Sequence, residues 1–238
     1  FYYKVKPRDN FFYFKNKLDG ARFDTISFGI QHNTERLLTL WFDQLVKKFK
    51  HKHIIFSGGV AQNIKSTKKI SENVNLDSLF VPPGPGDESV SIGACISLLK
   101  KNQPETKFYR VINPYLGTNY NKNDLNFLKK EKNIIIRKVT KKYISKLIFS
   151  GEVVARFSLN QSEFGSRALG NRSIIASPSN FMTIHKINKK VKIRDFWMPF
   201  APSMLPSEYN RLLKKNGKLN HTYMTASADG TNIGIKNI

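Results

Sequence analysis

The chain of 238 residues carries 40 Lys and Arg against 17 Asp and Glu, which gives a formal net charge of +23 at pH 7. Hydrophobic residues make up 40% of it, enough to bury a core, so the composition excludes a disordered chain. No apolar run reaches the roughly 18 residues that a membrane span needs, and no signal peptide is visible.

The positive charge consists mainly of lysines scattered along the whole chain. Such a charge attracts polyanions, but no nucleic-acid recognition module is visible, and an anionic small substrate fits the charge equally well. The single cysteine, Cys95, cannot form an internal disulfide, which predicts a cytoplasmic location. Because the chain opens on Phe1 and ends without an obvious closing element, we expect a piece of a longer protein.

Helices and strands alternate in the first half of the chain. Apolar residues at three- and four-residue spacing predict a long amphipathic helix over 24–50. In chain order we then expect a strand (54–57), a helix (60–70), a strand (78–83), a tight turn (84–87) and a helix (88–101). This order predicts an α/β fold whose loops gather at one edge of a sheet.

A polar, proline-containing stretch without periodicity, residues 104–114, is the predicted linker. Beyond it we expect a helix (124–132), a strand (134–139), a helix (141–149), two strands (152–157 and 173–176), a helix (181–191) and an extended segment (199–205). The chain is therefore predicted to form two units of mixed helix and strand.

Two tight turns in the first unit carry candidate ligand groups. Gly58 and Gly59 follow a strand and precede a helix, where main-chain N–H groups can approach a phosphate. Simple turn geometry explains two such glycines as well, and spacing alone favours that explanation. Asp87 ends the second turn, where spacing favours a helix cap over the alternative role of metal ligand.

The richest candidate is SEFGSRALGNRS, residues 162–173, which we call the arginine loop. It lies between two predicted strands and holds Arg167 and Arg172, with Asn171 and Ser173 as further hydrogen-bonding groups. The planar guanidinium group binds phosphate or carboxylate through two parallel hydrogen bonds. On these general grounds a ligand role and a structural role remain equally open.

A second basic motif, Lys192 with Arg194, ends the predicted helix after the arginine loop. Cations presented from turns suit an anionic ligand with several oxygens. A solvated helix end is the alternative, and we accept it for Lys186, Lys189 and Lys190.

Four segments together resemble one family: SGGVAQN, PPGPGDESVSIGA, GEVVARFSLNQSEFGSRALGNRSIIASP and VKIRDFWMPFAPSML. Over nearly the whole chain they resemble the C-terminal half of the O-carbamoyltransferases, the family of nodulation protein U and the cephem and aminoglycoside carbamoyltransferases. The resemblance implies that residues 1–103 are the C-terminal part of an ASKHA-type (actin-like ATPase) domain. It implies that residues 115–238 are a YrdC-like α+β domain, truncated at its C-terminus.

The resemblance also implies a reaction. The YrdC-like domain would form carbamoyl-adenylate from ATP and carbamoyl phosphate, with release of pyrophosphate. The ASKHA-type domain, with a divalent metal (Fe²⁺ or Mg²⁺), would pass the carbamoyl group to a hydroxyl of a small molecule or glycan. The acceptor is not specified by these residues, and a homodimer stays an open alternative.

The resemblance assigns roles residue by residue. The implied catalytic cations are Arg167, Arg172, Lys192 and Arg194. The implied substrate- or nucleotide-binding residues are Gly58, Gly59, Asn63, Asn171 and Ser173. Asp87 matches the family's metal-ligand aspartate, which reverses the preference for a helix cap.

Some positions depart from the family. Ser166 stands where proline is common, Gln161 lies near a position that is often basic, and Met198 replaces a frequent arginine. The family's paired metal-binding histidines belong to the preceding half-domain, and the histidines at 32, 51 and 53 are not that motif. A tRNA-modifying component of the threonylcarbamoyladenosine type and an inactive nucleotide-binding protein are the alternative functions.

Overall fold

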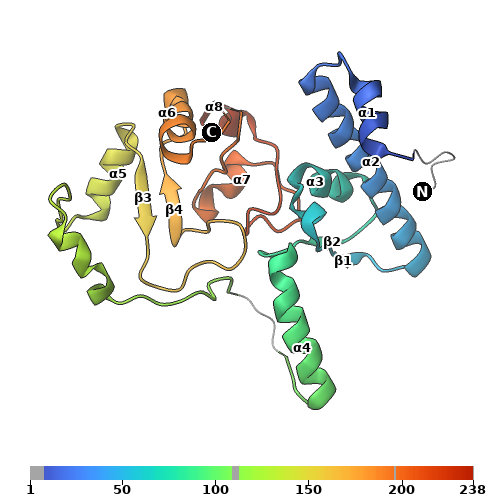
Figure 1. Ribbon diagram of the computed structural model, residues 1–238, viewed down its shortest axis with the longest axis horizontal. Coiled ribbons are helices and arrows are strands. Elements are labelled where there is room, and N and C mark those ends of the chain that lie inside the picture. Colours follow the sequence, from blue (N-terminus) through green and yellow to red (C-terminus); the bar gives the residue numbers. More distant parts are fainter. Residues whose placement is uncertain (1–7, 109–112, 196, 238) are drawn as a thin grey trace.

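The computed structural model describes residues 8–108, 113–195 and 197–237 of the chain. Two units of mixed helix and strand lie side by side, in agreement with the predicted mixture of α and β structure (Figure 1). The first unit contains α1 (Asn10–Leu18), α2 (Phe23–Phe49), β1 (His53–Ile55), α3 (Ile64–Asn73), β2 (Ser78–Phe80) and α4 (Val90–Asn102). Short 3-10 turns at Gly59–Gln62 and Asp87–Ser89 precede α3 and α4.

A parallel pair of short strands forms the centre of the first unit. β1 pairs with β2 in the register Ile54↔Leu79, and α2 and α3 pack beside them. The hydrophobic core consists of Phe42, Val46, Phe56, Ala61, Ile70, Val74, Leu76, Leu79, Val81 and Leu219. Parallel strands joined through a helix confirm the α/β prediction for this unit.

The helix α4 projects from the first unit, as Figure 1 shows. None of its residues is buried, and Val90 and Leu98 are 67% and 60% exposed. Within the described ranges of the chain, no helix combines the length and apolar character needed to cross a membrane.

An antiparallel hairpin forms the centre of the second unit. β3 (Val154–Phe157) pairs with β4 (Arg172–Ile175), and the register places Phe157 opposite Arg172. The other elements are a 3-10 helix (Lys122–Lys130), α5 (Lys141–Phe149), α6 (Phe181–Lys186), a π-helical turn (Ile187–Lys192), a 3-10 turn (Pro206–Glu208), α7 (Tyr209–Leu212) and α8 (Asn232–Asn237). The hairpin register places the arginine loop at one end of the two strands.

The predictions for this unit hold in part. The helix over 141–149 and the strands on either side of the arginine loop are confirmed. The predicted strand over 134–139 is wrong. Among the described residues, β1 pairs with β2 and β3 with β4, so residues 134–139 belong to neither sheet, and Ile135 is 89% exposed. β-branched residues favour extended backbone, but a strand requires a hydrogen-bonded neighbour. The predicted linker, 104–114, lies partly outside the described residues.

The C-terminal segment 216–229 returns to the first unit. Leu219 enters its core beside Leu79, whose N–H group donates to the carbonyl of Lys218 at 2.8 Å. Thr225 Oγ1 donates to the carbonyl of Val81 at 3.2 Å. The segment therefore joins the second unit to the first through both apolar and main-chain contacts.

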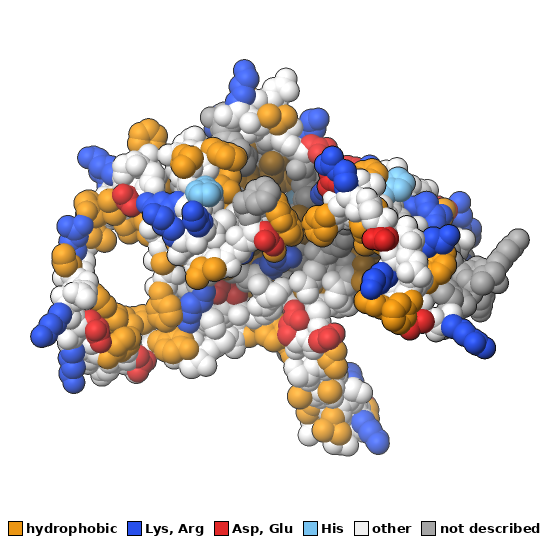
Figure 2. All heavy atoms as spheres, turned by 45° about the horizontal axis from the view of Figure 1, so that its top comes forward, with side chains coloured by type: hydrophobic (Ala, Val, Ile, Leu, Met, Phe, Trp, Pro, Cys, Tyr) orange, Lys and Arg blue, Asp and Glu red, His pale blue; other side chains and the backbone are white. Residues whose placement is uncertain are grey.

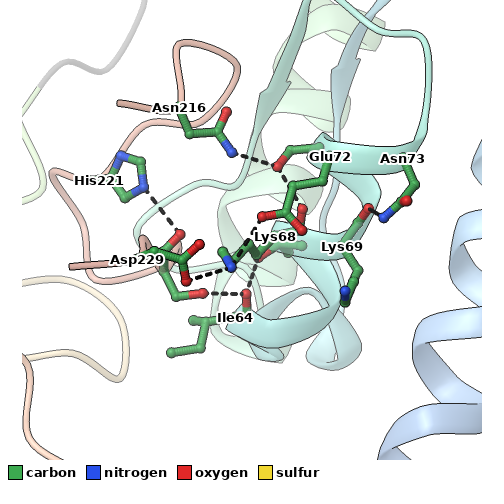
Figure 3. A network of polar contacts seen from close by, with 11 residues as sticks. Ile64, Lys68, Lys69, Glu72, Asn73, Asn216, His221 and Asp229 are labelled. Carbon is green, nitrogen blue, oxygen red and sulfur yellow. Dashed lines mark hydrogen bonds and ion pairs between the residues drawn. The ribbon is translucent and has the colours of Figure 1, made fainter. Parts of the chain in front are cut away.

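Polar contacts on α3 reinforce this return (Figure 3). Lys68 Nζ lies 2.8 Å from Asp229 Oδ1 and 3.1 Å from Glu72 Oε1. Asn216 Nδ2 donates to Ser71 Oγ at 2.8 Å. The hydrogen bond from Lys68 holds the pKa of the Asp229 carboxyl below its usual value, and the same contact raises the pKa of Lys68.

Candidate functional site

The two glycine turns of the first unit lie against each other. The carbonyl of Pro85 accepts hydrogen bonds from the N–H group of Gly58 at 2.6 Å and from Ser57 Oγ at 3.0 Å. Gly58 has a φ of +105°, which side chains rarely adopt, and no atom lies within 4 Å of an added Cβ at Gly58 or Gly59. The space beside the two glycines is therefore open, while the N–H group of Gly58 is already hydrogen-bonded to Pro85.

Asn63 and Asp87 occupy different surroundings. Asn63 caps α3, because its Oδ1 accepts from the N–H group of Ser66 at 3.1 Å, and its Nδ2 donates to Gln31 Oε1 at 2.9 Å. Asp87 is exposed at the start of its 3-10 turn, whose N-cap residue makes no side-chain hydrogen bond. The N-cap residue of α4 is Ser89, which makes no side-chain cap hydrogen bond, so the structure does not support a capping role for Asp87. The metal-ligand role of Asp87 stays a prediction.

A metal ion needs more ligands than Asp87 supplies. Within residues 8–108, 113–195 and 197–237, no group of three or more His, Cys, Asp and Glu side chains is arranged to hold a metal ion. The described residues alone do not form a metal centre.

Arg172 is the most firmly held cation of the arginine loop. Its Nη1 donates to the carbonyls of Ser158 at 3.0 Å and Asn171 at 3.1 Å. Its Cζ lies 4.0 Å from the ring centroid of Phe157 and 5.3 Å from that of Tyr120. Nη2 is buried and has no hydrogen-bond partner among the described residues. A buried donor without a partner is costly, so this nitrogen is suited to an anionic ligand.

Glu163 fixes the backbone that carries Arg172. Its Oε1 accepts from the N–H groups of Leu169 at 2.8 Å, Asn171 at 2.6 Å and Arg172 at 3.1 Å. Burial raises the pKa of the Glu163 carboxyl, but its own main-chain N–H group and these three N–H groups lower it, and the net pKa lies below its usual value. The sequence analysis missed this residue, because a carboxylate that binds main-chain N–H groups leaves no periodic pattern.

The other predicted loop residues differ in whether their side chains form hydrogen bonds within the protein. Asn171 donates through Nδ2 to the carbonyl of Gln161 at 2.7 Å and accepts from Arg156 Nη1 at 3.2 Å. Ser173 Oγ accepts from the N–H group of Gly170 at 2.9 Å. Both side chains thus shape the loop. In the described part of the chain, Arg167 makes no side-chain hydrogen bond or ion pair and is half-buried.

Lys192 and Arg194 form a separate cationic group. Arg194 Nε donates to Oδ1 of the buried Asn188 at 2.7 Å, and its Cζ lies 4.4 Å from the ring centroid of Phe200. Lys192 is exposed at the end of the π-helical turn. Across the described residues, no hydrogen bond, ion pair or ring contact links this group to the arginine loop.

A polar cavity of about 490 Å³ adjoins the arginine loop. Its lining residues are Asn113, Tyr115, Asn119, Arg156, Asn160, Gln161 and Asn171. Amide groups dominate this lining and supply both donors and acceptors, while Arg156 adds a positive charge. The lining therefore offers donors, acceptors and one positive charge, and neither Arg167 nor Arg172 is part of it.

The arginine loop touches the glycine turns of the first unit. Gly165 has a φ of +97°, and an added Cβ there would lie 2.6 Å from the carbonyl oxygen of Pro83. An added Cβ at Gly84 would lie 2.9 Å from the ring of Phe164, and Ser166 Oγ donates to Gln62 Oε1 at 3.1 Å. The two candidate regions predicted from sequence are therefore in direct contact.

Charge alone does not mark the site. Figure 2 shows Lys and Arg side chains distributed over much of the visible face, on both units. The local geometry around Arg172, rather than the net charge, distinguishes the arginine loop from the remaining basic surface.

Two family descriptions match the chain. Residues 6–96 match "Carbamoyltransferase N-terminus", and residues 145–236 match "Carbamoyltransferase C-terminus". The first match contains the glycine turns, and the second contains the arginine loop with Lys192 and Arg194.

Individual relatives agree with these matches. An uncharacterized protein of Methanocaldococcus jannaschii is 34% identical over 202 residues, which are 81% of this chain and 33% of that protein. Nodulation protein NolNO of Sinorhizobium fredii is 30% identical over 169 residues, 68% of this chain and 25% of that protein. Nodulation protein U of the same species is 27% identical over 177 residues, 72% of this chain and 30% of that protein. The chain thus spans a third or less of the length of these relatives.

Proposed function

Since the chain belongs to the carbamoyltransferase family, we propose that it takes part in ATP-dependent transfer of a carbamoyl group to a hydroxyl. We assign residues 115–238 to a YrdC-like domain that forms carbamoyl-adenylate. We assign residues 1–103 to the C-terminal part of an ASKHA-type domain in which the transfer occurs. A reaction that consumes ATP is consistent with the cytoplasmic location that the cysteine content predicts.

The observation that carries this proposal is the guanidinium group of Arg172. Main-chain carbonyls fix Nη1 and two aromatic rings pack against the group, while the buried Nη2 has no partner among the described residues. A donor held in place before the ligand arrives costs no reorganisation when negative charge develops beside it. Arg172 is therefore suited to bind carbamoyl phosphate or the phosphate of the adenylate.

The proposed chemistry balances with water as a reactant. Water takes the phosphoryl group from carbamoyl phosphate and leaves carbamate and inorganic phosphate. An oxygen of carbamate then attacks the α-phosphorus of ATP, the bond to pyrophosphate breaks, and carbamoyl-adenylate forms. The anions repel one another, so their positioning and neutralisation account for most of the catalysis.

The remaining predicted residues serve this scheme as follows. Arg167 would bind the same anions as Arg172, and Lys192 and Arg194 would neutralise nucleotide phosphates. Asn171 and Ser173 would act through the shape of the loop, because their polar atoms bind within it. In the first unit, the open backbone at Gly58 and Gly59 would admit a nucleotide, beside the helix that Asn63 caps.

The contact between the arginine loop and the glycine turns supports transfer between the two units. Carbamoyl-adenylate is a mixed anhydride that water would hydrolyse, so a short protected route between sites preserves it. Gly165 and Ser166 contact the first unit where such a route would run. We propose a small molecule or glycan as the hydroxyl-bearing acceptor, and a divalent metal held by Asp87 together with residues outside this chain.

The experiment is an assay of the purified chain with ATP, with and without carbamoyl phosphate. We expect pyrophosphate to appear only when carbamoyl phosphate is present, accompanied by at least the same amount of inorganic phosphate. ATP binding without pyrophosphate release would indicate a nucleotide-binding protein instead. Steeply salt-dependent tRNA binding without this turnover would favour a tRNA-modifying component.

A further inference from the structure

Polar groups of the backbone at 169–172 form hydrogen bonds with side chains of the second unit. The carbonyl of Leu169 accepts from Tyr115 Oη at 2.6 Å, and the carbonyl of Gly170 accepts from Arg156. The N–H group of Gly170 donates to Ser173 Oγ at 2.9 Å. The three other N–H groups of this stretch, those of Leu169, Asn171 and Arg172, all point to one carboxylate oxygen of Glu163.

Converging main-chain N–H groups commonly form a binding site for phosphate. Here the carboxylate of Glu163 occupies that position, because its Oε1 lies 2.6 to 3.1 Å from the three nitrogens. These N–H groups are therefore already hydrogen-bonded to Glu163, and an incoming phosphate must bind side chains instead. Arg172 is the side chain that the same backbone carries.

From this arrangement we infer that Glu163 is a positioning residue, which holds residues 169–172 so that the Arg172 guanidinium faces the carbamoyl phosphate or adenylate. This role rests on the proposed function, since it supplies the reason for placing the guanidinium. Hydrogen bonds to an ionised carboxylate are about twice as strong as neutral ones, so one side chain can fix the whole stretch. Glu163 itself contacts no substrate in this scheme.

Two substitutions separate the negative charge of Glu163 from its role as a hydrogen-bond acceptor. Glu163→Gln keeps an acceptor oxygen at the same reach but removes the charge, whereas Glu163→Ala removes the acceptor altogether. Glu131→Gln makes the same chemical change at an exposed position of the second unit and serves as the control. Thermal unfolding of each variant shows whether it is folded at the assay temperature.

The first measurement is hydrogen exchange of the full 238-residue chain without ligand, followed by mass spectrometry of peptides covering 164–173. We expect Glu163→Ala to speed exchange of the amides in this region at least about tenfold, with Glu163→Gln intermediate and Glu131→Gln unchanged. Unchanged exchange in folded Glu163→Ala would overturn the inference.

The second measurement is the rate of pyrophosphate release that depends on carbamoyl phosphate. We expect kcat of folded Glu163→Ala to fall about 100-fold, since a small misplacement of a catalytic group costs this much, and Glu163→Gln to restore part of the rate. Partial loss of folded protein would instead lower the rate in proportion to its folded fraction and leave KM unchanged.

The two measurements keep the two proposals apart. If the wild-type chain releases no pyrophosphate, the proposed function fails, while the exchange data still decide whether Glu163 orders the loop. A third outcome would also overturn the inference: tighter binding of ATP by Glu163→Ala would mean that the carboxylate competes with phosphate for the loop N–H groups.

Discussion

The core of the first unit and the arginine loop are stabilised by different forces. The core is a cluster of apolar side chains, of which Ile70 and Ala61 are fully buried. The arginine loop is held instead by hydrogen bonds of its backbone: main-chain N–H groups donate to Glu163 and Ser173, and the carbonyl of Leu169 accepts from Tyr115. Apolar burial supplies most of the stability of a fold, whereas a polar network fixes the position of particular groups. Stability and activity should therefore respond to mutation in different regions of this chain.

The largest expected effect on stability is in the core. Ile70→Ala should lower the free energy of unfolding by about 2–5 kcal/mol, because it removes buried methyl groups and leaves a cavity. Ile174→Ala, at a half-buried position of β4, should cost less. Urea unfolding measures both, and equal losses would contradict the difference in burial between Ile70 and Ile174.

The next largest effect on the free energy of unfolding is expected at the contact between the two units. Gly165→Ala should lower the free energy of unfolding by about 1–3 kcal/mol, because its φ of +97° and the nearby carbonyl of Pro83 leave no room for Cβ. Gly217→Ala is the control, since no atom lies within 4 Å of its added Cβ. Similar unfolding curves for the two variants would show that the contact with Pro83 is dispensable.

A smaller, pH-dependent effect is expected where the C-terminal segment meets α3. The pKa of Asp229 is lowered in the folded state, so its ion pair with Lys68 stabilises above the usual carboxyl pKa and weakens as pH falls through the folded value. The raised pKa of Lys68 maintains the pair up to alkaline pH. Asp229→Asn should thus lower the urea midpoint slightly at pH 7 and have less effect toward pH 3. A constant difference across this range would contradict the ion pair.

Elements with strong local patterns could be predicted from the sequence. Apolar spacing identified α2 because this helix carries an amphipathic repeat, and the helix predicted over 141–149 is α5. The apolar run at 134–139 indicated a strand that does not form, since pairing depends on a neighbour that the local sequence does not encode. The packing of Leu219 in the core of the first unit could not be predicted from local sequence patterns either, because 140 residues separate it from Leu79.

In the candidate site, too, some features could be predicted from the sequence and others needed the structure. Glycines, arginines and their spacing pointed to the glycine turns and to the arginine loop, and the structure brings these into contact through Gly165. The capping role of Asn63 and the loop contacts of Asn171 and Ser173 needed the structure, because one amide or hydroxyl can serve a ligand or the backbone. Glu163 and Asn188 were missed because side chains that bind another stretch of the chain leave no periodic pattern in the sequence.

The most direct test of the account is exchange of labelled pyrophosphate into ATP, which reports reversible formation of the adenylate. We expect exchange in the wild-type chain only with carbamoyl phosphate present. Arg172→Ala should lower it at least about 30-fold, which corresponds to roughly 2 kcal/mol of lost transition-state stabilisation. Lys189→Ala, at an exposed lysine, is the control and should retain the wild-type rate. Equal exchange in Arg172→Ala and Lys189→Ala would contradict the claim that the arginine loop binds the reacting anions.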